Sequence, residues 1–189
     1  TDPERQIRII QACAPNQIGT DWVVGWGHFV DDLLNTQRPP AEILDEAVPD
    51  HPAIIMEFTS HSMWANSKAL EAAGITRDTP DPVGGIIVRD PGTGEPNGLL
   101  IDNAGDIVYS LAFERTDELL DLAYDGLLYM MEEMPSQGIT SIADARVYWK
   151  RGHHEVWQRA ADNNALQVRT VLGLWGYPEH DDSQIEILK

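Results

Sequence analysis

The chain contains only one cysteine, Cys13, among its 189 residues. A single cysteine can form neither an intrachain disulfide nor a cluster of thiolate metal ligands. Such sparing use is typical of a reducing compartment, so we expect a cytoplasmic location. Cys13 falls in a helical pattern, which predicts a small core residue rather than a nucleophile. No apolar run approaches the roughly 20 residues of a membrane helix, and the first residues lack a signal-peptide pattern.

Basic residues are also scarce, because 13 Lys and Arg stand against 31 Asp and Glu, for a formal net charge of -18. This charge repels the phosphates of nucleic acids and anionic lipids, so we expect neither a nucleic acid nor a membrane as partner. The simplest role of the excess acid is solubility. With 42% hydrophobic residues the chain can still bury a core, and its length suffices for one domain or for one and part of another.

A turn-rich stretch from Thr79 to Gly105 organises the rest of the chain. Two short apolar runs, Ile86–Val88 and Leu99–Ile101, flank a bend rich in Pro and Gly at Asp90–Pro96. This arrangement predicts a β-hairpin. The second strand ends at Asp102, which places a carboxylate at the entrance of any pocket that the hairpin lines.

The same region resembles amidohydrolase family 3, a group of metal-dependent hydrolases. Several segments carry the resemblance, in the order in which the family has them. They are His61–Leu70, Ala73–Ile75, Thr79–Pro82, Gly85–Asp90 and Thr93–Gly98. Weaker similarity extends to the stretch that begins at Thr20, to Arg38–Pro40 and to Gly138–Ala145, so the resemblance covers most of the chain.

Apolar spacing and turn residues predict further elements on both sides of the hairpin. The expected helices cover 2–14, 29–34, 41–47, 66–72, a segment beginning near 106, 117–134 and 153–163, and the expected strands cover 21–27, 53–59, 139–143 and 167–175. After Gly138 strand, helix and strand alternate, as in a parallel βαβ unit. We therefore expect an α+β substrate-side domain over residues 1–138 and a βαβ segment over residues 139–189.

The resemblance places these two parts in a larger fold. Family members, as the resemblance implies, are (β/α)8 barrels with an additional domain inserted between early barrel elements. The expected fold class is therefore α/β, with an α+β insert domain that contains the hairpin, followed by a partial TIM-barrel segment. A closed eight-stranded barrel takes about 250 residues and does not fit here, so we expect the chain to be an internal fragment.

Two polar residues lie at predicted strand ends, where loops commonly carry binding groups. His61 lines the substrate pocket, as the resemblance implies, although the residues alone allow a structural or surface histidine. Asp102 stands where many family members have Glu, and its oxygens suit a divalent ion. A cap of the helix that begins near Asp106 is the alternative. We expect His61 to bind substrate and Asp102 to be catalytic.

Asp144 follows another apolar run, and in a barrel the carboxyl ends of the strands build the active site. A catalytic role is expected, with an N-cap or an ion pair to Arg146 as the alternative. Trp22, Trp64 and Asn66 complete the candidate substrate-binding residues. Burial in the core is the default for the tryptophans, which would otherwise line an apolar pocket.

The metal ligands stay unknown. The family's first two ligands come from a His-x-His pair, as the resemblance implies, and no such pair occurs in the chain. His153 and His154 precede Glu155, but the HExxH spacing is missing because position 158 is Gln158. A divalent metal, with zinc expected, therefore belongs to the parent enzyme, and none is expected in the fragment.

The resemblance implies hydrolysis of a carbon–nitrogen bond other than a peptide, in a small-molecule substrate, by metal-activated water. The fragment itself is expected to contribute pocket walls and to be inactive. Unpaired strand edges in residues 139–189 favour self-association, so a homo-oligomer is one of the expected partners. The alternative is a self-contained acidic module that binds a small molecule or a protein on a Trp-bearing hairpin face without catalysis.

Overall fold

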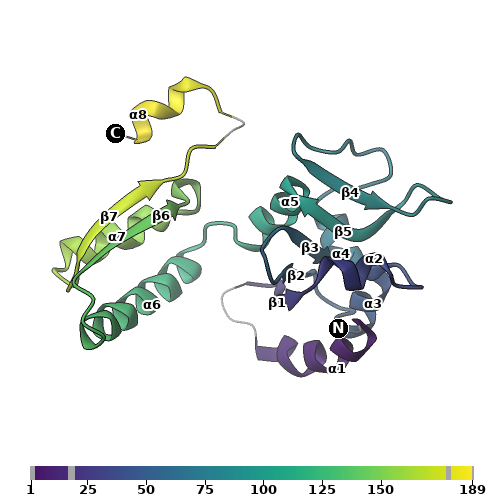
Figure 1. The fold of residues 1–189 in the computed structure, drawn as a ribbon, viewed down its shortest axis with the longest axis horizontal. Coiled ribbons are helices and arrows are strands. Elements are labelled where there is room, and N and C mark those ends of the chain that lie inside the picture. Colours follow the sequence, from purple (N-terminus) through teal and green to yellow (C-terminus); the bar gives the residue numbers. More distant parts are fainter. Residues whose placement is uncertain (1–2, 17–19, 178–179, 189) are drawn as a thin grey trace. The chain divides into compact units, whose positions relative to one another are not determined.

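The computed structural model describes residues 3–16, 20–177 and 180–188. The chain forms two compact units, of which the first ends at Phe113 and the second begins at Glu114 (Figure 1). The sequence-based division after Gly138 lies further along the chain. It differs because the long helix α6 (Asp117–Ser136) packs on the βαβ elements that follow it and so belongs to the second unit.

A five-stranded mixed sheet, with strand order β1-β2-β3-β5-β4, forms the centre of the first unit. Its strands are β1 (Val23–His28), β2 (Ala53–Glu57), β3 (Ser62–Ala65), β4 (Gly85–Arg89) and β5 (Pro96–Asp102). β1 and β2 are parallel, whereas the other neighbouring pairs are antiparallel. β1, β2 and β5 therefore end at the same edge of the sheet, where β3 and β4 begin.

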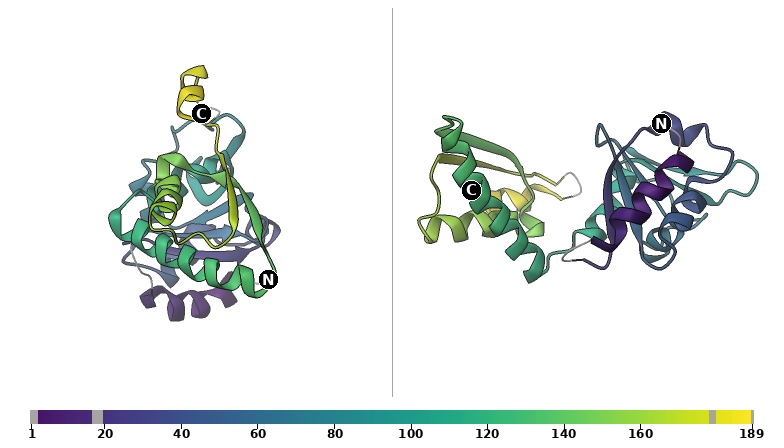
Figure 2. Two further views of the ribbon diagram at one scale, coloured as in Figure 1. Left: turned by 90° about the vertical axis from the view of Figure 1, so that its left-hand side faces the viewer. Right: turned by 90° about the horizontal axis from the view of Figure 1, so that it is seen from below.

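Helices cover both faces of this sheet (Figures 1 and 2). Ile55 in β2 packs with α1 and α3 on one face, whereas its neighbour Ile54 packs with α4 and α5 on the other. Trp64 and Met63 of β3 divide between the faces in the same way, because successive side chains of a strand point in opposite directions. The helices are α1 (Pro3–Cys13), α2 (Val30–Leu34), α3 (Pro40–Ala47), α4 (Ser67–Ala72) and α5 (Asn103–Ala112).

Helix α1 agrees with the predicted helix, and Ile7 and Ile10 are buried as its apolar spacing requires. Cys13 is exposed, so the prediction that it joins the core is wrong. The helix ends at this residue, and Ala14 packs against the core in its place.

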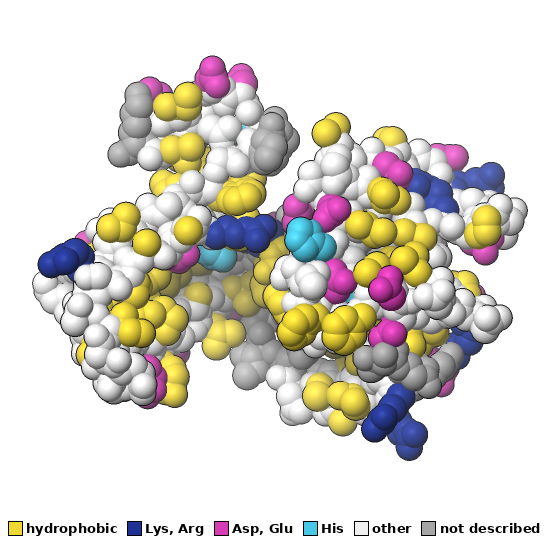
Figure 3. Space-filling view, viewed as in Figure 1, with side chains coloured by type: hydrophobic (Ala, Val, Ile, Leu, Met, Phe, Trp, Pro, Cys, Tyr) yellow, Lys and Arg dark blue, Asp and Glu magenta, His cyan; other side chains and the backbone are white. Residues whose placement is uncertain are grey.

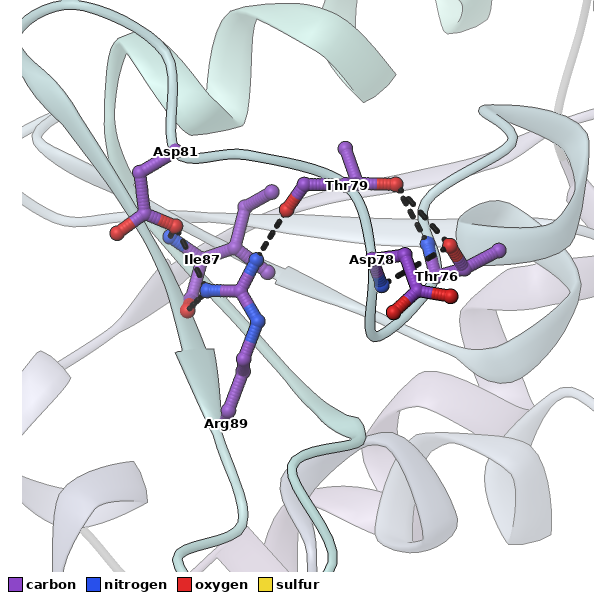
Figure 4. Close-up of polar contacts among 6 residues, drawn as sticks. All are labelled: Thr76, Asp78, Thr79, Asp81, Ile87 and Arg89. Carbon is purple, nitrogen blue, oxygen red and sulfur yellow. Dashed lines mark hydrogen bonds and ion pairs between the residues drawn. The ribbon is translucent and has the colours of Figure 1, made fainter.

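The predicted hairpin is present, because β4 and β5 pair in antiparallel fashion. Figure 4 shows how Arg89 ties the first strand to the loop that leads into it. Its guanidinium donates to Asp81 at 2.7 Å, to the carbonyl of Ile87 at 2.8 Å and to the carbonyl of Thr79. Asp81 also accepts from the amide of Ile87 at 3.2 Å. The ion pair of Arg89 and Asp81 therefore connects the backbone of β4 at Ile87 with that of the preceding loop at Thr79.

The second unit contains the predicted βαβ arrangement. β6 (Ser141–Val147) and β7 (Arg169–Leu174) pair in parallel, and α7 (His153–Asp162) connects them. α6 and α7 cover one face of this pair through a cluster of buried residues that includes Met131 and Trp157. On the other face Val171 is exposed. The last described element is α8 (Ile185–Leu188), and short 3-10 helices lie at Ala14–Asn16, Trp149–Arg151 and Asp182–Gln184.

The fold is therefore mixed α/β, as predicted at that level. Neither the five-stranded sheet nor the pair β6-β7 closes into a barrel, so the structure does not confirm a partial TIM barrel. Among the described residues, no helix combines the length and the apolar character needed to cross a membrane.

Candidate functional site

Polar side chains gather at the edge of the first sheet where β1, β2 and β5 end. We call this group the polar edge, and it consists of His28, Glu57, His61, Ser62 and Asp102. His28 and Glu57 close β1 and β2 and pair in register, while Ser62 opens β3 and Asp102 closes β5. In α/β proteins, ligands commonly bind outside the carboxyl ends of parallel strands, so this edge is the first place to look for a site.

Two members of the polar edge are buried and contact each other. The side chain of His28 is only 1% exposed, and its Nε2 lies 3.1 Å from the hydroxyl oxygen of Ser62. Burial removes the imidazolium from water and lowers the pKa of His28 to about 4, against a smaller opposing effect of the Glu57 carboxylate. His28 is therefore neutral near pH 7.

Glu57 is a buried carboxylate with several donors around it. The hydroxyl of Thr59 donates to its Oε2 at 2.8 Å, and the amide of Val30 donates to its Oε1 at 3.4 Å. Burial raises the pKa of Glu57, but the hydrogen bonds outweigh burial and lower that pKa overall. The carboxylate is therefore ionised, and it holds the ends of β1 and β2 together.

His61 and Asp102 form the exposed half of the polar edge. The Nδ1 of His61 lies 2.9 Å from Oδ1 of Asp102, and the side chains are 76% and 49% exposed. The Asp102 amide also donates to the carbonyl of His61 at 2.8 Å, so both backbone and side chain hold the pair. When Nδ1 carries the proton and donates to the carboxylate, Nε2 of the neutral ring is an acceptor. The pair can thus take a proton from, or orient, a molecule bound beside it.

The backbone of Asp102 lies in a region that suits glycine, with φ 48° and ψ -127°. A non-glycine residue there costs about 1–3 kcal/mol, and such residues concentrate at functional sites. Asp102 holds the N-cap position of α5, but its side chain makes no capping hydrogen bond. Its carboxylate is directed to His61 instead, so the capping role considered from the sequence is not observed.

Aromatic residues lie next to the polar edge. Phe29 follows His28, Phe58 follows Glu57, and the two exposed rings stack with centroids 5.8 Å apart. The amide of Phe58 donates to the carbonyl of His28 at 3.0 Å, which holds the two chain segments together. Figure 3 shows apolar side chains beside histidine and acidic side chains on this unit. The edge therefore offers apolar surface next to hydrogen-bonding groups.

The other predicted substrate-binding residues do not join His61. Trp64 is fully buried, and its indole N–H donates to the carbonyl of Pro40 at 2.6 Å. Asn66 is also fully buried, and its amide makes four hydrogen bonds to the backbone. Trp22 is half-buried just before β1, at the opposite edge of the sheet. Trp64 and Asn66 thus support the fold in this structure and offer no surface to a ligand.

The hairpin strands β4 and β5 contain no tryptophan, so the Trp-bearing hairpin face expected for a binding module is not formed.

Asp144 lies within β6 rather than at its end, because the strand continues to Val147. It is half-buried, like Ile142 on the same side of the strand, and its Oδ1 accepts from the amide of Arg146 at 3.3 Å. The strand predicted over residues 139–143 is too short at its end, because Asp144 and Arg146 interrupt the apolar run on which the prediction depended. Asp144 belongs to the second unit and His61 to the first.

The sequence alone did not identify His28 and Ser62 as part of the site. They are 34 positions apart, and only the pairing of β1, β2 and β3 brings them together. Glu57 was visible only as the charged member of an otherwise apolar run. No local spacing signals such a group.

A metal does not fit the described residues by themselves. Within the described ranges, no group of three or more His, Cys, Asp or Glu side chains is placed to hold an ion. His61 and Asp102 supply one nitrogen and one carboxylate, and these already contact each other. Two ligands of this kind fall short of the three or four protein ligands of a typical zinc site.

Comparison with known proteins identifies the family of the chain. The amidohydrolase family matches residues 3–187. A Bacillus subtilis protein named as amidohydrolase YtcJ is 42% identical over 88 residues, which make up 47% of this chain and 16% of that protein. The N-substituted formamide deformylase of Arthrobacter pascens is 30% identical over 155 residues, 82% of this chain and 28% of that enzyme.

A solved structure, an uncharacterized metal-dependent hydrolase from Pyrococcus horikoshii OT3, superposes with a TM-score of 0.58 at 17% identity. The superposition covers 98% of this chain and 33% of that one. This likeness concerns the fold. The chain spans less than a third of the length of the curated relatives that it matches. The match along nearly the whole sequence shows that the chain belongs to the amidohydrolase family.

Proposed function

We propose that this chain is part of a metal-dependent hydrolase that cleaves a carbon–nitrogen bond, other than a peptide bond, in a small molecule. Membership of the amidohydrolase family supports the reaction class. A relative named as a formamide deformylase supports an amide-type substrate, and a structural neighbour named as a metal-dependent hydrolase supports the metal. The metal, zinc in this proposal, would be held by residues of the complete protein outside the described set.

The same proposal assigns a place to each unit. β6, α7 and β7 would form a segment of a (β/α)8 barrel, and the first unit would be the domain inserted into it. Parallel pairing supports this, as does the coverage of only one face of the strands by helices, because barrel strands place helices outside and side chains inside. With no metal-binding group among the described residues, the isolated chain is proposed to be inactive. The single cysteine supports a cytoplasmic location.

The contact between His61 and Asp102 is the observation on which the proposed site depends. Asp102 accepts the hydrogen bond of Nδ1–H and thereby fixes the tautomer and orientation of the ring. Nε2 of His61 is then the atom that accepts a proton or a hydrogen bond from the substrate. Phe29 and Phe58 would pack against apolar parts of the substrate and exclude water from one side.

The test uses the complete enzyme with His61→Ala and Asp102→Asn. Each change should lower turnover by about 100-fold or more, as expected for the loss of an acid–base group, with little change in melting temperature. His51→Ala is the matched control, because His51 is an exposed histidine whose Nδ1 contacts a backbone carbonyl, that of Asp21. This control should retain full turnover.

If both site variants lose stability while turnover per folded molecule stays unchanged, the two residues are structural and the proposed site is wrong. Asp144→Asn, measured in the same assay, tests the remaining predicted catalytic residue.

A further inference from the structure

Aromatic and basic side chains to which the proposed hydrolysis assigns no role gather where β6 and β7 end. We call this group the aromatic–cation cluster, and it consists of Arg146, Tyr148, Trp149, Lys150, Arg151, Trp175 and Tyr177. The residues follow or end two neighbouring parallel strands, so they meet at the carboxyl edge of that pair. This is the kind of edge at which α/β folds bind small molecules.

Backbone contacts hold the rings of this cluster in place. The indole N–H of Trp149 donates to the carbonyl of Trp175 at 2.9 Å, and the amide of Trp175 donates to the carbonyl of Val147 at the same distance. The ring of Tyr148 lies 5.7 Å from that of Trp175, and Trp149 meets Tyr177 edge-on at 5.4 Å. Because contacts between both strands fix the rings, the surface is formed before any ligand arrives.

Positive charge is concentrated on these rings. The guanidinium carbon of Arg146 lies 5.4 Å from the ring centre of Tyr148 and 4.9 Å from that of Trp175, while that of Arg151 lies 4.4 Å from Tyr148. Lys150 places its ammonium 4.1 Å from the ring of Tyr177. In a chain with a net charge of -18, three of 13 basic residues thus fall within residues 146–151. These basic groups can offer charge-assisted hydrogen bonds to an anionic ligand.

Arg146 differs from the arginines that neutralise this acidic chain. Arg115 and Arg159, for example, each pair with a carboxylate. The side chain of Arg146 is exposed and stacks on rings, and within the described part of the chain it forms no ion pair. The carboxylate of Asp144, close by in the sequence, accepts from the backbone amide of Arg146 instead. A stacked guanidinium keeps the N–H groups at its edge available for a two-pronged bond to a carboxylate.

We propose that the aromatic–cation cluster binds a small organic carboxylate that carries an aromatic ring. Arg146 holds the carboxylate, and the half-buried rings of Tyr148 and Trp175 supply apolar surface for the ligand's ring. The site lies wholly within the second unit. In the proposed barrel the carboxyl ends of β6 and β7 would face the active site, so this inference rests on the proposed function and names the ligand class of that edge. The test measures binding and not turnover, so a failure of binding is distinguishable from a failure of hydrolysis.

The experiment titrates the purified chain with benzoate and follows the NMR signals of the Arg146 Nε–H and of the indole N–H groups of Trp149 and Trp175. We expect saturable shifts at these groups, weakened by added salt. Arg146→Gln should raise the Kd about tenfold or more, because it removes a charge-assisted, two-pronged bond. Arg169→Gln is the matched control. This exposed arginine lies at the opposite end of β7 and contacts Ser141, so its loss should leave the Kd unchanged.

One neutral aromatic probe and one charged non-aromatic probe separate the contribution of the ligand's charge from that of its ring. Benzamide has the same ring without the charge, and inorganic phosphate has charge without the ring, so both should bind at least about tenfold more weakly than benzoate. Equal binding of either probe would overturn the proposed ligand class, and an unchanged Kd in Arg146→Gln would overturn the site. If that variant does not fold, as judged by circular dichroism, Arg146→Lys replaces it. Lysine keeps the charge but lacks the planar fork, so the Kd should still rise.

Discussion

Asn66→Ala should destabilise the first unit strongly, because this one amide connects three parts of the chain. Its Oδ1 accepts from the amides of Ala53 and Ala69, both at 2.9 Å. Its Nδ2 donates to the carbonyls of Val48 and His51 at 3.0 and 2.9 Å. The side chain therefore caps α4, fixes the start of β2 and holds the loop between α3 and β2. It is fully buried, so water cannot replace these partners.

The expected loss is about 4 kcal/mol or more. A hydrogen bond of this kind contributes about 1 kcal/mol net, and the truncation removes four of them. Each backbone group left buried without a partner adds a cost of its own, of about 1–3 kcal/mol where no water enters. Loss of the helix cap alone accounts for about 1 kcal/mol of the total.

Urea unfolding followed by amide hydrogen exchange in β2 and β3 would measure this loss, because exchange at these strands reports on the first unit separately from the second. Asn35→Ala is the control. Asn35 is on the surface, and its side-chain amide donates to the carbonyl of Asp31 at 2.6 Å, so the loss of this side chain should cost no more than about 0.5 kcal/mol. If Asn66→Ala costs no more than Asn35→Ala, the account of Asn66 as the link between these segments is wrong.

Three further predictions concern the same unit. Because the pKa of His28 is lowered from 6.5 to about 4, the unfolded state binds a proton more readily, and stability should fall by roughly 3 kcal/mol as the pH drops from 6.5 to about 4. In His28→Asn the urea midpoint should fall less steeply with decreasing pH than in the unmodified protein, and equal slopes would contradict this. Gly98→Ala should cost about 3 kcal/mol in thermal unfolding, because a Cβ there would lie 2.6 Å from both the amide nitrogen of Ala41 and the carbonyl oxygen of Ala65 at a φ of +96°. Gly94→Ala, at a similar φ but with open space, should cost about 1 kcal/mol, and equal losses would refute the packing argument. Asp102→Gly should raise stability by about 1 kcal/mol by relieving the backbone at φ 48°, whereas Asp102→Asn should not, and a lower melting temperature for the glycine variant would argue against strain.

Local signals were sufficient for most elements of the fold. The hairpin was predictable because a bend rich in Pro and Gly separates two β-branched or apolar runs. The start of α6 was predictable because Thr116 caps it, accepting from the amide of Leu119 at 3.2 Å. Strand β3 was not predicted, since its four residues are all buried and show no alternation. Pairing with β2 and β5 determines its structure, and a single sequence does not display such pairing.

For the site, sequence reasoning found His61 and Asp102 but not their contact, which joins residues 41 positions apart. Trp64 is the opposite case, because the sequence suggested a substrate-binding residue where the structure has a buried core residue. A tryptophan in an apolar context suits both a pocket and a core. Only the packing of α3 against β3 shows that Trp64 belongs to the core. Asn66 likewise has the polarity of a binding residue, yet its partners are all backbone groups of its own unit.

The junction between Phe113 and Glu114 has a consequence for the modularity of the gene. Both buried clusters of the first unit lie entirely before it, and the cluster of the second unit lies entirely after it. On the far side, Arg115 is paired with Glu155, and Thr116 caps α6, so both serve the second unit. A recombination event or an engineered split at this junction would interrupt none of these clusters, so the first unit could be exchanged between relatives with its buried core intact.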